Sequence, residues 1–89
     1  MKENEHKVLN SLYDDNGQTS YELEKNTGLD VYELDDSVKT LQNRGHVCEV
    51  KFENMAYYIT EAGKGIVRRK REEYDRKHAN DNKIKVLKK

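Results

Sequence analysis

The sequence has one cysteine and no long apolar run. Cys48 is the only cysteine among 89 residues, so no disulfide can form within the chain. The three histidines stand far apart, and no Cys/His cluster has the spacing of a zinc site. No apolar stretch approaches the ~20 residues of a membrane span, and the polar N-terminus lacks a signal-peptide core. We therefore expect a cytoplasmic protein without a membrane segment, metal or cofactor.

Apolar residues are few, and no catalytic arrangement stands out. Hydrophobic residues make up 34% of the chain and charged residues 38%. A chain of this length and composition supports one small core, with part of it solvated. No Ser/His/Asp, Cys/His or paired-carboxylate arrangement is distinct from ordinary surface chemistry. The sequence therefore predicts one domain that is not an enzyme.

The net charge of zero hides a division along the chain. Residues 1–63 carry 6 basic and 13 acidic side chains, a balance of −7, whereas residues 64–89 carry 11 basic and 4 acidic ones, a balance of +7. This asymmetry favours contact of the basic part with a polyanion. The alternative is a solvated basic helix that only offsets an acidic body.

Apolar spacing predicts two helices in the first third of the chain. Residues 4–14 place four large side chains on one helical face: Val8, Leu9, Leu12 and Tyr13. Asn16 and Gly17 end this helix, because both tolerate left-handed backbone. Thr19 and Glu22 have the spacing of a capping box, which predicts a short second helix over residues 20–26.

A third helix follows a turn at Thr27 and Gly28. Asp30 and Glu33 repeat the capping-box spacing. Behind them, positions 0, 3, 7 and 10 form one helical stripe of apolar residues, which are Val31, Leu34, Val38 and Leu41. Gly45 is a typical residue just beyond a helix C-terminus. The pattern predicts a helix from residue 31 to about residue 44.

Residues 46–52 and 55–60 are rich in β-branched and aromatic side chains and predict an antiparallel hairpin. Because side chains alternate along a strand, Val47, Glu49 and Lys51 share one face. We expect the other face, with Cys48, Val50 and Phe52, to lie inside.

Thr60 is a credible N-cap for a last helix over residues 61–78. Residues 79–82 interrupt its pattern, and residues 79–89 are expected to form a mobile basic tail. Gly63 and Gly65 are expected to weaken the first turns of this helix.

These elements predict an α+β fold, a winged helix-turn-helix with a three-helix core, a two-stranded β-hairpin wing and a C-terminal helix. The expected divisions are a winged-helix domain over residues 1–67, a continuation of the last helix over 68–78, and the tail. The expected core consists of Leu9, Leu12, Leu23, Leu29, Leu34, Val38, Leu41, Val50, Phe52 and Ile59.

Three segments in this order resemble the winged helix-turn-helix transcription regulators, broadly the MarR and PadR families. They are YELEKNTGL at 21–29, RGHV at 44–47 and YYITEAG at 57–63. The stripe of Leu34, Val38 and Leu41 between the first two also carries the resemblance, which covers about residues 4–70. It implies a sequence-specific DNA-binding transcription regulator that occupies double-stranded DNA, with the third helix in the major groove. It also implies groove-facing positions on that helix, which are Tyr32, Glu33, Asp35, Asp36, Lys39 and Thr40.

The candidate DNA contacts combine these positions with nearby basic residues. They are Tyr32, Lys39, Thr40, Asn43, Arg44, Lys51, Arg68, Arg69 and Arg71. The last helix is also a candidate for homodimerisation through Ile66, Val67 and Tyr74, because a polar helix needs a surface to pack on.

Three carboxylates on the third helix depart from the family pattern, in which basic or small polar residues are usual. Carboxylates repel phosphate, and few base contacts suit them. The alternative function is therefore a protein-interaction module, whose acidic third helix contacts a basic surface on a partner.

Overall fold

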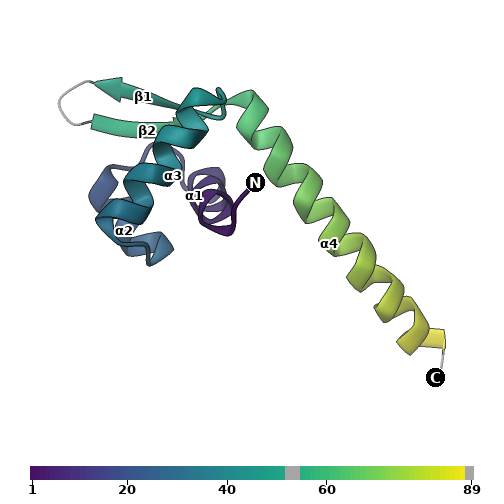
Figure 1. Ribbon diagram of the computed structural model, residues 1–89. Helices are drawn as coiled ribbons and strands as arrows, with labels where there is room; N and C mark the ends of the chain where they lie inside the picture. The colour runs from purple at the N-terminus through teal and green to yellow at the C-terminus, as the bar shows by residue number, and fades with distance from the viewer. Residues whose placement is uncertain (52–54, 88–89) are drawn as a thin grey trace.

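The computed structural model describes the backbone of residues 1–51 and 55–87 and the side chains of residues 1–51 and 55–77. Its elements are α1 (Glu3–Asp14), α2 (Ser20–Thr27), α3 (Val31–Asn43), β1 (Val47–Lys51), β2 (Met55–Ile59) and α4 (Glu61–Leu87). Helices α1 to α3 group together beside the hairpin, and α4 projects from this group as a long rod (Figure 1). The molecule measures 56 × 24 × 22 Å. The predicted α+β winged helix and its element order are confirmed.

Capping boxes begin both helices of the helix-turn-helix, as the sequence predicted. In α2, the Thr19 hydroxyl accepts from the Glu22 N–H at 3.2 Å, and the Glu22 carboxylate accepts from the Thr19 N–H at 3.1 Å. In α3, the Asp30 carboxylate accepts from the Glu33 N–H at 2.8 Å. Gly28 ends α2 at a φ of 74°, which is left-handed backbone that glycine adopts readily. The turn between the two helices is therefore short and fully capped.

The core lies where α1, α2, α3 and the hairpin meet. Eight predicted core residues are buried, and these are Leu9, Leu12, Leu23, Leu29, Leu34, Val38, Leu41 and Ile59. Val50 is only half-buried and lies outside the core, so that prediction is wrong. Phe52 lies outside the described residues. Four residues that the prediction omitted complete the core, and these are Val8, Val47, Tyr57 and Val67.

The hairpin turns the opposite face inward from the one predicted. Val47 pairs with Ile59 and Glu49 with Tyr57 in antiparallel register. Val47 is 3% exposed, whereas Cys48 is exposed to solvent. A shift of one residue reverses every side chain of a strand, and both faces of β1 carry a valine. The inner face is therefore decided by β2, where Tyr57 and Ile59 are buried.

Gln18 joins the hairpin to the helices through an additional strand position. Its backbone forms a bridge with Tyr57, with N···O distances of 3.1 and 2.8 Å. Its side chain is fully buried. The Gln18 amide donates to the carbonyl oxygens of Ser11 at 2.9 Å and Asp15 at 2.6 Å, and accepts from Asn26 at 2.8 Å. One polar residue thus links α1, α2 and β2.

Helix α4 begins at Glu61 and is capped by Thr60, as predicted. The Thr60 hydroxyl accepts from the Gly63 N–H at 3.2 Å and donates to the Gly45 carbonyl at 2.7 Å. The predicted end near His78 is wrong, because the helical backbone continues to Leu87. Polar residues such as those at 80–82 cost well under about 1 kcal/mol each in a helix, so they weaken the helix without stopping it.

Gly63 is required by close packing at the start of α4. A Cβ at this position would lie 2.3 Å from the His46 carbonyl oxygen and 2.8 Å from Cγ1 of Ile59. A Cβ at Gly65 would meet nothing within 4 Å. The two glycines share one helical turn and differ only in their surroundings.

We expect Gly63→Ala to destabilise the protein by about 1–3 kcal/mol, because the new methyl group overpacks the junction. Gly65→Ala should instead stabilise it by about 0.5–1 kcal/mol, because alanine is the better helix former. Urea unfolding of both variants beside the wild type measures these changes. Equal effects of the two substitutions would show that α4 does not pack on the His46 carbonyl.

Candidate nucleic-acid interface

The side of α3 opposite the core presents a straight row of exposed residues. Each residue turns an α-helix by about 100°, so positions 32, 36, 39 and 43 lie within about 60° of one another. We name this row the outer stripe, and its members are Tyr32, Asp36, Lys39 and Asn43. All four are exposed, whereas Leu34, Ser37, Val38 and Leu41 are buried on the other side. The core packing of α3 therefore determines which side chains reach outward.

Aromatic and aliphatic surface lies at the N-terminal end of the outer stripe. Tyr32 is 83% exposed and Val31 is 54% exposed. They border a hollow of about 210 Å³ between α2, α3 and β2, whose floor includes Tyr57. The start of α3 is thus the most apolar part of this face.

The three carboxylates on α3 differ in what they contact. Glu33 accepts from the Asp30 N–H at 3.3 Å and from the Asn4 amide at 3.4 Å, so it serves the helix start. Asp35 forms an ion pair with Lys39 at 3.0 Å. Asp36 makes no side-chain hydrogen bond or ion pair with any residue whose side chain the structure describes. Only one of the three carboxylates is thus left without a partner of this kind.

The helix start and the Asp35–Lys39 pair also shift two ionisations. Backbone hydrogen bonding from Glu33 lowers the pKa of Asp30, because the carboxylate form accepts that bond. The hydrogen bond from Lys39 to Asp35 raises the pKa of Lys39. Both groups stay charged near neutral pH, and Lys39 keeps its positive charge on the outer stripe.

Arg44 occupies an ion pair that the sequence did not reveal. Its guanidinium donates to the Glu5 carboxylate at 2.8 Å, and Glu5 is only 3% exposed. A carboxylate buried to this extent needs a partner to remain charged. Arg44, predicted as a DNA contact, thus holds the end of α3 against α1. Glu5 lies 39 residues away in sequence, so no local pattern could have paired them.

The remaining predicted contacts of this face flank the outer stripe. Thr40 is half-buried, and its hydroxyl donates to the Asp36 carbonyl oxygen at 3.0 Å. Lys51 is exposed at the end of β1, 3.8 Å from the Glu49 carboxylate. The outer stripe and the end of β1 therefore offer lysines on two separate elements.

Two of the three predicted arginines on α4 contact α1. Arg68 donates to the Tyr13 hydroxyl at 3.3 Å, and the Arg71 guanidinium lies 4.7 Å from the centroid of the Tyr13 ring. Arg71 also pairs with Asp14 at 3.0 Å. Cation–π and charged contacts of this kind hold helices together at a surface. Arg69 is exposed beside this junction.

The basic part of α4 and the outer stripe belong to different sides of the molecule. Helix α1 packs against both α3 and α4. Figure 1 shows α4 leaving the helical group and extending away from it. The described basic residues of α4 and the outer stripe therefore lie on two helices that both pack on α1.

The predicted dimer residues on α4 have different environments. Val67 is 2% exposed within the core of its own chain, so the expectation that it contacts a partner is wrong. Ile66 is partly buried against the same core. Tyr74 is 64% exposed further along the helix. Ile66 and Tyr74 remain predicted dimer contacts.

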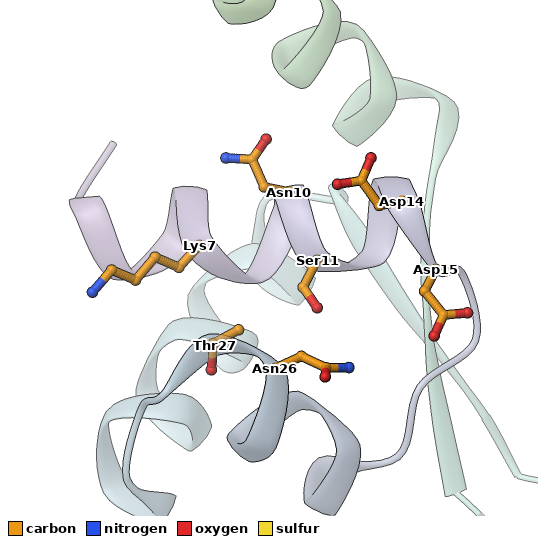
Figure 2. A pocket seen from close by; sticks show the side chains of 7 residues that line it. All are labelled: Lys7, Asn10, Ser11, Asp14, Asp15, Asn26 and Thr27. Atoms are coloured by element: carbon orange, nitrogen blue, oxygen red, sulfur yellow. The ribbon is translucent and has the colours of Figure 1, made fainter.

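A hollow of about 580 Å³ lies between α1 and the end of α2. Figure 2 shows Lys7, Asn10 and Asp14 along α1 above Asn26 and Thr27. These side chains are exposed or half-buried polar groups. The described residues also include no cluster of metal-ligating side chains and no helix long and apolar enough to cross a membrane. The residues that line this hollow therefore do not indicate a particular class of ligand.

Comparison with known proteins identifies the fold. No protein-family model matches the sequence, and no curated protein does either. Solved structures do match. A MarR family transcription regulator superposes with a TM-score of 0.86 over 93% of this chain at 16% identity. A MarR family protein from Bacillus stearothermophilus gives 0.85 over 99% at 22% identity. The fold is that of the MarR regulators.

A third match is the S. aureus MepR–DNA complex, with a TM-score of 0.80 over 98% of this chain at 13% identity. The chain spans 58% of the first regulator, 68% of the B. stearothermophilus protein and 75% of MepR. It spans 51% and 52% of two further regulators, from Bordetella bronchiseptica and Streptomyces coelicolor. The predicted resemblance to MarR regulators is therefore confirmed for the fold.

His6 lies at the junction of α1 and α4 and gives it a dependence on pH. It borders a hollow with Ile66, Arg69, Lys70 and Glu73. Burial lowers the pKa of His6 below 6.5, and the positive charges of Lys70 and the N-terminus lower it further, while Glu5 opposes them. The unfolded chain therefore binds this proton more tightly than the folded chain.

We expect the free energy of unfolding to decrease as the pH falls below about 6.5, the ordinary pKa of histidine, toward the lower pKa of folded His6. The stabilisation is fully present above that range. Urea unfolding at pH 7.5, 6.5 and 5.5 tests this against His6→Gln, which cannot titrate there. The wild type should lose more stability than the variant; equal losses would show that His6 does not contribute.

Proposed function

We propose that the protein is a transcription regulator, not an enzyme, that binds double-stranded DNA and acts by occupying its site. The observation that carries this proposal is the outer stripe, which presents Tyr32, Lys39 and Asn43 on the second helix of a helix-turn-helix. That helix lies in the major groove in most proteins of this architecture. The likeness to MepR, whose structure was determined with DNA, supports the same use of the fold.

Basic residues on either side of the outer stripe support a contact with DNA phosphates. Lys51 at the end of β1 lies where a wing contacts backbone phosphates. The basic segment from Lys64 onward carries +7 and is the main positive charge of the chain. Because α1 packs against both α3 and α4, we propose that Arg69 and the basic residues that follow it in sequence contact phosphates outside the groove that the outer stripe enters. Arg68 and Arg71 contact Tyr13, so only the part of each guanidinium that faces away from Tyr13 is proposed to contact phosphate.

We further propose that the protein acts as a homodimer held together by α4. This helix has 27 residues and projects beyond the helical group. A polar helix of this length is stabilised mainly when the apolar side chains along one of its faces pack against another surface. Tyr74 lies on the projecting part and, among the side chains of α4 that the structure describes, is the large hydrophobic one that is most exposed. A two-fold dimer would also present two outer stripes to successive major grooves.

A second candidate function is protein binding by the same face. The observation that favours it is the exposed surface of Tyr21, Val31 and Tyr32 at the start of the acidic helix α3. Most of the basic residues of the chain lie on another helix, α4. A partner with a basic and apolar surface would fit this face. The DNA measurements below distinguish the two candidates.

Lys39→Ala is expected to weaken binding to DNA and to reduce its salt dependence. Each phosphate contact that is lost should lower the slope of log affinity against log salt concentration by about 0.9. Fluorescence anisotropy with sheared genomic duplex between 50 and 200 mM salt measures both quantities. Lys7→Ala removes the same charge from α1, in the polar hollow of Figure 2, and should change neither much. Absence of binding at 50 mM salt would reject the DNA function and favour the protein-binding one.

Tyr74→Ser is expected to shift the protein from dimer toward monomer. The reason is that it removes the main apolar side chain from the proposed contact on α4. Sedimentation equilibrium at high micromolar concentration measures the change. Tyr32→Ser removes another exposed tyrosine, from the outer stripe, and should leave the dimer intact. A wild-type monomer at this concentration would contradict the dimer.

A further inference from the structure

We infer that Asp36 selects a C·G base pair in the target site by accepting a hydrogen bond from the N4 amino group of cytosine. This inference rests on the proposed function and names a specificity-determining residue for it. It gives a role to the one carboxylate of α3 that the fold itself does not use.

The position of Asp36 places it among the base-reading residues. It lies on the outer stripe between Tyr32 and Lys39, one turn from each, and it is exposed. The N-terminal half of a recognition helix is the part that meets base edges. A carboxylate at this position faces the groove floor instead of the core of its own domain.

The environment of Asp36 leaves its oxygens available. Glu33 is held by the Asp30 N–H and the Asn4 amide, and Asp35 by Lys39. The Asp36 side chain has no such partner among the side chains that the structure describes, and the Thr40 hydroxyl contacts only its backbone carbonyl. An aspartate introduced into a phosphate-lined groove is repelled unless a donor offsets the charge.

The chemistry of the major groove restricts that donor. Guanine presents only acceptors at O6 and N7, and thymine presents an acceptor and a methyl group. Adenine has an N6 donor, but its neighbouring N7 acceptor repels a carboxylate. Cytosine itself presents only the N4 donor in the groove, and this donor is the base contact that suits aspartate.

Lys39 complements this choice. It lies three residues beyond Asp36 on the same stripe, and its ion pair with Asp35 restrains its side chain. Lysine donates to the O6 and N7 acceptors of guanine. Asp36, which only accepts hydrogen bonds, and Lys39, which only donates them, therefore match the cytosine donor and the guanine acceptors of the same or neighbouring base pairs.

Selection of binding sites from a random duplex library tests the inference, using the full chain and its Asp36→Asn and Asp35→Asn variants. The wild type should require cytosine at one position of each half-site, with other bases reducing affinity by about 5- to 150-fold. Asp36→Asn should move that preference to adenine, which asparagine contacts through N6 and N7. Asp35→Asn removes the same charge from the adjacent residue and with it the ion pair of Lys39, so it changes the overall affinity, but it should not move the preference from cytosine to adenine.

Both variants should retain the circular dichroism and melting temperature of the wild type, because both positions are exposed. An unchanged cytosine preference in Asp36→Asn would overturn the inference. Binding to DNA without any base preference would overturn it as well, while leaving the proposed DNA binding intact. A wild type that binds no duplex would overturn both.

Discussion

The buried amide of Gln18 is the interaction on which the arrangement of the other elements depends. Its side chain contacts the last turn of α1 and the Asn26 side chain at the end of α2, while its backbone pairs with Tyr57 of β2. The Gln18 side chain itself lies out of water, where an unpaired amide or carbonyl costs about 1–3 kcal/mol. Because the contacts satisfy one another, the hairpin has a single register against the helices, and Tyr57 and Ile59 point into the core.

The orientation of α3 follows from that framework. The hairpin packs behind α3, and the pair between Arg44 and the buried Glu5 holds its C-terminal end against α1. At its other end, the capping box uses Asp30 and Glu33. With both ends restrained, the apolar residues face the core and the outer stripe faces solvent. The candidate interface is thus a consequence of packing on the opposite side of the same helix.

In the folded chain, part of the acidic and basic charge that the sequence separates is engaged in contacts between side chains. Arg68 and Arg71 contact Tyr13 and Asp14, so part of the positive charge attaches α4 to α1. On α3, two of the three carboxylates are engaged with a helix start and a lysine. Counting charges along the chain overstated both the basic surface of α4 and the repulsion that α3 offers to phosphate.

The sequence by itself determined the elements, because helix caps, turns and apolar periodicity are local. Thr19, Asp30 and Gly45 mark helix boundaries, and the leucines of α1 to α3 repeat at helical spacing, so the winged helix could be predicted. Only the tertiary structure decided which face of β1 is buried, that Arg44 pairs with Glu5, and that Val67 belongs to the core. These features depend on residues far apart in the chain, and a strand with a valine on each face carries no local signal for its inner side. The length of α4 was also missed, because weak helix formers at 80–82 lower helix stability without ending the helix.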